Sequence, residues 1–72
     1  MLRSSVKITR GELSVMRLIG MGHSSKQVAN ILFVSRRTVD LHLTNVYVKL
    51  GVKNRLRAIL KLSELGILPL EH

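Results

Sequence analysis

The side chains best suited to chemistry in this chain lie between Arg36 and Val48. Guanidinium, hydroxyl and carboxamide groups recur there, and such groups form hydrogen bonds with the edges of paired bases. Leu41 and Val48 lie among them and suit the methyl group of thymine in the major groove. Arg36 and Arg37 stand where a helix should begin, so they could clamp phosphate, read bases or do both. The alternatives are ordinary surface arginines, and a neighbouring domain that covers Leu41 and Val48.

Other kinds of functional site have little support in the sequence. The three His residues are far apart and Cys is absent, so we expect no metal site and a reducing cytosol as the compartment. No nucleophile–base pair, carboxylate pair or phosphate-binding glycine loop occurs, so we expect no catalytic residue, no cofactor and no enzyme activity. No apolar run approaches the roughly 20 residues that span a bilayer, so we expect no membrane partner.

The charge balance indicates an anionic partner. Twelve Lys and Arg residues against four Asp and Glu give a formal charge of +8 in 72 residues. The chain has one Phe, one Tyr and no Trp, too few aromatic rings to stack single-stranded bases. Duplex DNA is therefore the favoured partner. A module that binds acidic proteins and a basic helix that acts on membranes are the rival hypotheses.

The elements that would position these groups are helices. Apolar residues recur at every third or fourth position, which predicts helices throughout. Thr9 with Glu12 and Ser24 with Gln27 form the pattern of a capping box. Glycines follow three of the segments and are typical of helix ends. We expect an all-α fold of four helices, over 10–21, 25–32, 36–50 and 55–65.

The second and third helices match a helix-turn-helix layout. A turn of three residues separates them, and the longer third helix has a basic start. On a helical wheel Leu43, Val46 and Leu50 fall within about 40° of Val39, and the four residues form a core stripe. The opposite side should lie in the major groove; it carries Arg37, Leu41, Thr44 and Val48, with Asn45 and Thr38 on one edge and Asp40 on the other.

Three residues near this side keep open alternatives. A carboxylate repels phosphate, so Asp40 could accept from cytosine, pair with a neighbouring arginine or lie at the rim of the groove. His42 lies at the margin of the core stripe, where a packed, hydrogen-bonded ring is favoured over DNA contact. Lys49 could reach the DNA backbone or bind the last carbonyls of its own helix. His23 is expected in a loop, facing solvent.

The fourth helix carries two apolar lines. Leu56, Ile59 and Leu60 form one, and Ala58, Leu62 and Leu65 form the other. One line can close the core, and the second is surplus in a monomer. We expect a two-fold homodimer on DNA, with an interface made of Ala58, Leu62 and Leu65. The alternative is that this line covers an upstream domain.

Residues 7–68 resemble the helix-turn-helix domains of LuxR-type (FixJ/NarL or GerE-like) transcription regulators. The spacing of the family is unbroken over most of the chain. The matching pieces, with Thr9 and Glu12 ahead of them, are LSVMRLI (13–19), GHSSKQVA (22–29), LFVS (32–35), TV (38–39), HL (42–43), NV (45–46), KLGV (49–52) and NR (54–55).

The resemblance implies the C-terminal output domain of a bacterial, cytoplasmic regulator that binds specific duplex sequences. Its third helix would read bases and its fourth would aid dimerisation. Base contacts would come from Asp40, Leu41 and Thr44, but a common pattern carries Lys at positions 40 and 44, so the binding sequence is not inherited. Phosphate contacts would come from Ser24 or Ser25, Lys26, Thr38, Lys49 and Arg55; position on the third helix adds Arg36 and Asn45.

The resemblance also sets the expected boundaries. The domain should cover residues 8–68. Residues 1–7 read as a linker or tag remnant that follows an upstream regulatory domain missing from this chain. Residues 69–72 read as a tail that could come from an expression vector.

Overall fold

A computed structural model describes residues 6–68 of the chain, and within that range it contains four α-helices and no strand. The helices are α1 (Arg10–Gly20), α2 (Ser25–Leu32), α3 (Arg36–Leu50) and α4 (Arg55–Glu64). The predicted all-α fold is confirmed, and α1 and α4 each end one residue earlier than expected. The predicted tail at 69–72 and most of the predicted linker lie outside the described residues.

Side-chain caps begin all four helices, and the two predicted capping boxes are confirmed. In α1 the Glu12 N–H donates to the Thr9 hydroxyl at 3.2 Å, and the Thr9 N–H donates to Glu12 Oε1 at 3.0 Å. Ser24 and Gln27 repeat this capping box ahead of α2. Each cap binds N–H groups that the first helical turn leaves free. The two later helices start with single caps, in which the Thr38 N–H donates to the Ser35 hydroxyl and the Arg57 N–H donates to Asn54 Oδ1.

Each helix is followed, within two residues of its last residue, by a residue with positive φ. Gly51 ends α3 with φ 69°, a conformation that costs glycine nothing. Phe33 ends α2 with φ 58° and is the one non-glycine residue with positive φ in the described range. Its side chain is 93% exposed, so no packing of the ring compensates for that backbone conformation.

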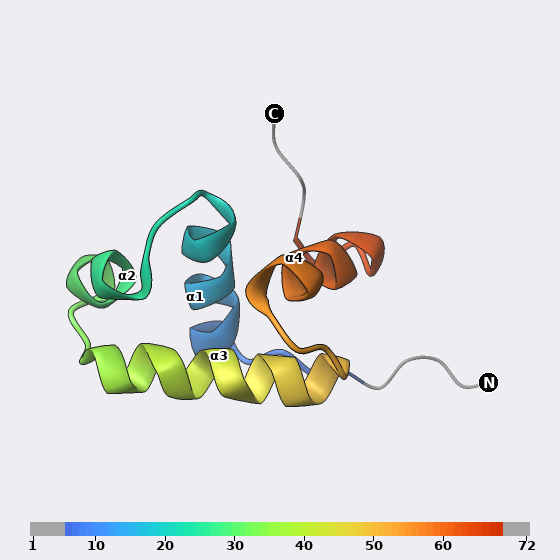
Figure 1. The fold of residues 1–72 in the computed structure, drawn as a ribbon, viewed down its shortest axis with the longest axis horizontal. Helices are drawn as coiled ribbons and strands as arrows, with labels where there is room; N and C mark the ends of the chain where they lie inside the picture. Colours follow the sequence, from blue (N-terminus) through green and yellow to red (C-terminus); the bar gives the residue numbers. More distant parts are fainter. Residues whose placement is uncertain (1–5, 69–72) are drawn as a thin grey trace.

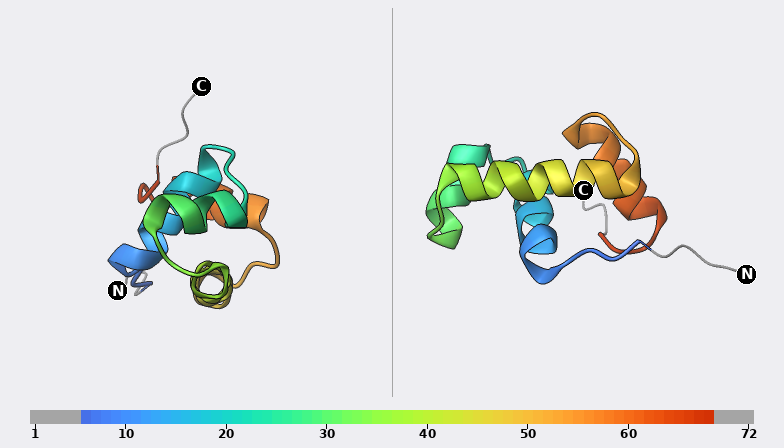
Figure 2. Two further views of the ribbon diagram at one scale, coloured as in Figure 1. Left: turned by 90° about the vertical axis from the view of Figure 1, so that its left-hand side faces the viewer. Right: turned by 90° about the horizontal axis from the view of Figure 1, so that it is seen from below.

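The four helices are arranged around α3. Figure 1 shows α3 running along one side of the domain, with α2, α1 and α4 side by side above it. The same order is visible from below in Figure 2, where α1 lies between α2 and α4. α3 contacts each of the other three helices. The side of α3 that faces away from them is consequently left uncovered.

The core lies between α3 and the other helices. The stripe predicted for α3, Val39, Leu43, Val46 and Leu50, is buried in full. Leu68, beyond the last helix, also packs into this core and is 5% exposed. The remaining buried apolar residues are Val15, Met16, Ile19, Val28, Ala29, Ala58 and Leu62.

Candidate nucleic-acid interface

The uncovered side of α3 is formed by the residues predicted to read bases. Leu41 and Val48 are 58% and 76% exposed, and Thr44 is exposed between them. Apolar side chains on a solvent-facing helix lose the free energy that burial would give them. Their position opposite the core stripe therefore favours a surface that another molecule covers.

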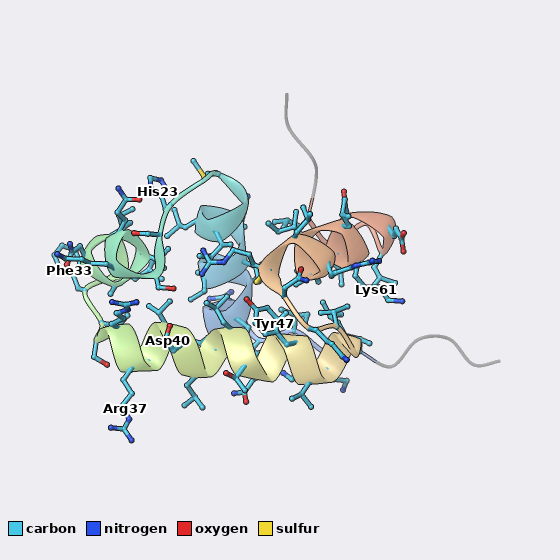
Figure 3. All side chains as sticks on the ribbon, viewed as in Figure 1. His23, Phe33, Arg37, Asp40, Tyr47 and Lys61 are labelled. Carbon is cyan, nitrogen blue, oxygen red and sulfur yellow. The ribbon has the colours of Figure 1, made fainter. Side chains whose placement is uncertain are left out.

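Arg37 and Asp40 leave this helix in different directions. Arg37 projects beneath α3, away from the rest of the domain, whereas Asp40 lies on the flank of the helix (Figure 3). Within residues 6–68 neither side chain takes part in an ion pair. The suggested pairing of Asp40 with a neighbouring arginine is therefore absent, and the cytosine contact and the groove rim stay as hypotheses.

Most of the predicted phosphate ligands are accessible. Ser24 and Lys26 are exposed at the start of α2, Arg36 and Asn45 are exposed on α3, and Arg55 is exposed at the start of α4. Thr38 is half-buried, and its hydroxyl lies 3.0 Å from that of Ser35. Arg36, Thr38 and Asn45 lie on α3 itself, beside which the DNA backbone would pass if α3 occupied the groove.

Ser25 is a correction to the predicted set. Only 6% of this residue is exposed, because it lies on the side of α2 that packs against the domain. Ser24 and Ser25 were alternatives for one phosphate contact, and of the two only the side chain of Ser24 is exposed. Its hydroxyl already accepts from the Gln27 N–H at 3.2 Å, so it would meet a phosphate while it caps α2.

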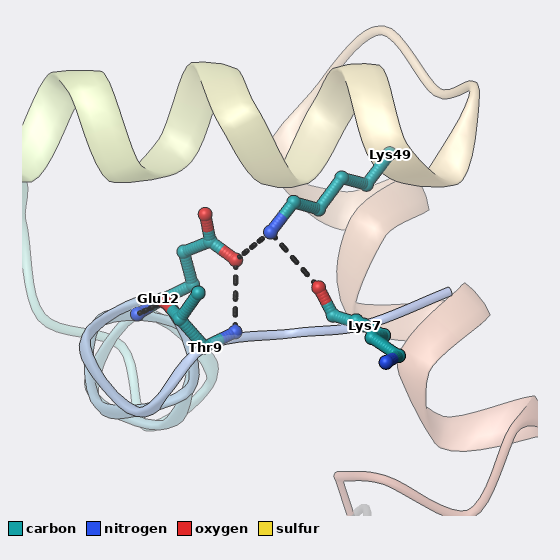
Figure 4. Close-up of polar contacts among 4 residues, drawn as sticks. All are labelled: Lys7, Thr9, Glu12 and Lys49. Carbon is teal, nitrogen blue, oxygen red and sulfur yellow. Dashed lines mark hydrogen bonds and ion pairs between the residues drawn. The ribbon is translucent and has the colours of Figure 1, made fainter. Parts of the chain in front are cut away.

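Lys49 is a second correction. Its Nζ donates to Glu12 Oε1 at 2.6 Å and to the Lys7 carbonyl at 2.9 Å (Figure 4). This geometry contradicts one predicted role, a cap on the last carbonyls of its own helix, and the other, a phosphate contact, stays a prediction. The ammonium joins α3 to α1 and to the segment before α1.

The carboxylate that meets Lys49 is almost completely buried. The Glu12 side chain is 4% exposed, against 32% for the side chain of Lys49. Burial alone raises the pKa of Glu12. The hydrogen bond from Lys49, the hydrogen bond from the Thr9 N–H and the charge of Lys49 together lower it more, so the pKa lies below its ordinary value of 4.5. Glu12 is therefore held in its charged form.

His42 packs against the start of α1. A Cβ placed on Gly11 would lie 3.0 Å from both Cε1 and Nε2 of the imidazole, so the absence of a side chain at Gly11 makes room for the ring. The predicted packing of His42 is confirmed. The predicted hydrogen bond is absent at its buried Nδ1, which has no partner among the described residues. His23 is half-buried rather than facing solvent as predicted.

The predicted dimer residues on α4 are a third correction. Ala58 and Leu62 are 0% exposed because this line of α4 packs into the core of its own domain, so neither can contact a second copy. Leu65, just past the helix, is 38% exposed. The surplus line is the other one, with Leu56 and Leu60 at 63% and 43% exposure.

Other kinds of site find no support in the part of the chain that is described. Among residues 6–68, no group of three or more His, Cys, Asp or Glu side chains could hold a metal ion. In the same range no helix combines the length and the apolar character needed to cross a membrane.

Comparison with known families identifies the fold. Residues 6–62 match the family of bacterial regulatory proteins called the luxR family. The chain belongs to this family. The luxR family consists of transcription regulators that bind DNA, and this domain is of that DNA-binding type.

Solved structures and sequence relatives agree with this assignment. The spore germination protein GerE of Bacillus subtilis is 37% identical over 68 residues, which cover 94% of this chain and 92% of GerE. The structure titled transcription factor GerE superimposes with a TM-score of 0.83 at 38% identity, covering 88% of this chain and 94% of that one. The response regulator ChrA of a heme-sensing two-component system also gives 0.83, at 32% identity, with 94% of this chain covered.

The relatives differ greatly in length. The luxR-family domain described here spans 33% of ChrA and 6% of HTH-type transcriptional regulators of Mycobacterium bovis and Mycobacterium tuberculosis, which are 48% identical over 52 residues. GerE, by contrast, is matched over nearly its whole length. The same domain thus occurs both nearly alone and as a small part of larger regulators.

Proposed function

We propose that this domain binds specific sequences of duplex DNA with α3 in the major groove. The observation that carries the proposal is the uncovered side of α3. Arg37 projects away from the other helices there (Figure 3), and Leu41, Thr44 and Val48 are exposed opposite the buried stripe. A guanidinium and a hydroxyl can bond to base edges, and Leu41 and Val48 can contact thymine methyl groups. Asp40, on the flank, completes the set of base-reading candidates.

Backbone contacts would set the position of the domain on the duplex. We assign them to the exposed members of the predicted set, and Ser25 and Lys49 leave it for the reasons given above. Contacts of this kind fix orientation and strengthen binding to all sequences alike. The assigned residues are Ser24, Lys26, Arg36, Thr38, Asn45 and Arg55.

The domain would act as the output part of a transcription regulator in the bacterial cytoplasm. Response regulators such as ChrA support a regulatory domain ahead of it, and GerE supports a regulator that consists of little more than this fold. We propose further that two copies meet on DNA through the exposed leucines of α4, Leu56 and Leu60. A two-fold pair of domains would bind half-sites related by the same symmetry.

Selection from a random pool of duplexes, followed by titration, tests the proposed function. The selected duplex should bind more tightly than a shuffled duplex of equal composition. Affinity should fall by a factor on the order of a thousand or more between about 50 and 200 mM salt, since several phosphates lose their counterions. A module for acidic protein partners would bind no duplex selectively.

Two substitutions separate base reading from backbone contact. Arg37→Ala should change the preferred sequence, because a guanidinium that bonds to base edges discriminates among bases. The matched control, Lys26→Ala, also removes one cation, but it should weaken all duplexes equally and lower the salt slope by about one. Equal, sequence-independent losses from both variants would refute the base-reading side of α3.

A further inference from the structure

The ammonium of Lys49 joins three separate parts of the domain. It extends from the last turn of α3, donates to Glu12 on α1 and donates to the carbonyl of Lys7 in the segment ahead of α1. We call residues 6–9 the strap. The second contact of Glu12 Oε1, with the Thr9 N–H at 3.0 Å, lies in the strap as well (Figure 4). One lysine and one carboxylate therefore tie the strap to both helices.

The strap is held on one side and open on the other. Val6 and Ile8 are half-buried and pack against the core, whereas Lys7 is exposed between them. A hollow of about 440 Å³ runs beside the strap and is lined by Val6, Lys7, Thr9 and Lys49. Its polar contacts include the bond from Lys49 to the Lys7 carbonyl and the bond from the Thr9 N–H to Glu12.

Separation of the Lys49 ammonium from Glu12 would cost free energy. Glu12 is a carboxylate with 4% of its side chain exposed, and withdrawal of the ammonium would leave a buried negative charge without its partner. An exposed contact with a phosphate returns much less free energy than that charge would lose. In a complex with DNA the ammonium should therefore stay on Glu12.

Lys49 follows directly after Val48, one of the residues proposed to read bases. The contacts of Lys49 with Glu12 and Lys7 thus act on the turn of α3 that carries Val48, the last of the proposed base-reading residues. A shift of one side chain by about 1 Å is enough to break a hydrogen bond, so the tilt of this turn against α1 matters for base contacts.

We propose that Lys49 is a positioning residue for DNA reading. Its contacts with Glu12 and with the strap form a clamp that holds the last turn of α3 against α1. Docking of the strap and sequence-specific binding of DNA therefore strengthen each other. The proposal rests on the proposed function, since it requires that α3 reads bases. Coupling between two binding events is reciprocal. DNA should therefore stabilise the docked strap as much as the docked strap favours the specific complex.

The first test measures the strap directly in the unmodified chain. The Thr9 N–H bonds to Glu12 inside the clamp, so its hydrogen exchange reports whether the clamp is closed. Addition of the duplex selected from the random pool should slow this exchange several-fold, and a shuffled duplex at equal saturation should slow it less. Equal exchange rates with the two duplexes would overturn the coupling.

The second test compares Lys49→Met with Lys61→Met. Both variants lose one cation and keep an apolar stem, but Lys61 is exposed on α4, and its side chain makes no hydrogen bond or ion pair in the described part of the chain. Lys49→Met should lower the ratio of selected to shuffled binding by about tenfold, at a temperature where circular dichroism shows it folded. Its salt slope should match that of Lys61→Met.

The other outcomes each give a different answer. A uniform loss with a slope lower by about one would make Lys49 a phosphate ligand and refute the clamp. If folded Lys49→Met keeps the ratio of selected to shuffled binding unchanged, Lys49 has a structural role only, and the clamp is refuted as well. If Lys49→Met does not fold, Glu12→Gln keeps an oxygen for the Thr9 N–H and should lower the same ratio. Absence of selectivity in the unmodified chain would instead sink the proposed function.

Discussion

The carboxylate of Glu12 serves two purposes at once. It completes the capping box of α1, as its distance of three residues from Thr9 predicts. It also forms an ion pair with Lys49, which lies on α3, 37 residues further along the chain. Local geometry accounts for the first contact. The second depends on the packing of α1 against α3, and it engages the one lysine that α3 contains.

The stability of the domain should fall in acid because of this carboxylate. The folded pKa of Glu12 lies below its unfolded value, so its contribution is complete above about pH 4.5 and is lost as the pH falls through the lower folded value. Urea unfolding at several pH values between about 6 and 3 measures this loss. Glu12→Gln should flatten that part of the profile, and an unchanged profile would contradict the assignment.

Among the helices, the cap residues explain where each begins. Four side-chain caps precede the first turns, and three of the four helix ends are followed within two residues by a glycine with positive φ. α2 is the exception, because Phe33 holds the left-handed conformation there. A side chain with a Cβ pays a steric cost in that region which glycine avoids.

Phe33→Gly should stabilise the domain by about 1 kcal/mol. The ring is 93% exposed, so its removal loses little packing, while the backbone strain at φ 58° disappears. Phe33→Ala is the matched control, since it removes the ring and keeps the Cβ, and it should leave the stability nearly unchanged. Urea denaturation of the three proteins measures the effect; a less stable Phe33→Gly would mean that the ring makes a contact in solution.

For the domain as a unit, α4 decides how copies can meet. Its two apolar lines look equivalent in the sequence, but packing against α1 and α3 buries Ala58 and Leu62 and leaves Leu56 and Leu60 outside. These two leucines lie one turn apart on the same side of α4. The proposed pairing through α4 would therefore use this line, because the residues of the buried line are not at the surface.

Leu60→Glu should abolish pairing of the domain on DNA while it leaves the fold intact. A carboxylate at a residue 43% exposed costs the monomer little, but in a two-fold interface it would desolvate a charge against leucines of the other copy. Sedimentation on a duplex with two half-sites measures the stoichiometry. Lys61→Met, at the adjacent exposed position, should pair normally. A Leu60→Glu variant that still pairs would exclude this side of α4.

The helices themselves could be predicted from the chain because their limits depend on residues close in sequence. A cap acts within three or four positions, and the stripe of Val39, Leu43, Val46 and Leu50 follows from the helical repeat alone. The uncovered side of α3 is the complement of that stripe. It was therefore predictable as well, and its members Leu41 and Val48 are exposed as the wheel required.

Tertiary structure decided whatever depends on the positions of the other helices. No local pattern distinguishes the buried line of α4 from the exposed one, since both are equally apolar. Ser25 is buried, and Lys49 is bound to Glu12, only because α1 and α2 pack where they do. Leu68 enters the core from beyond the last helix for the same reason. Burial and long-range pairing are properties of the packed helices, and periodicity within one helix does not contain them.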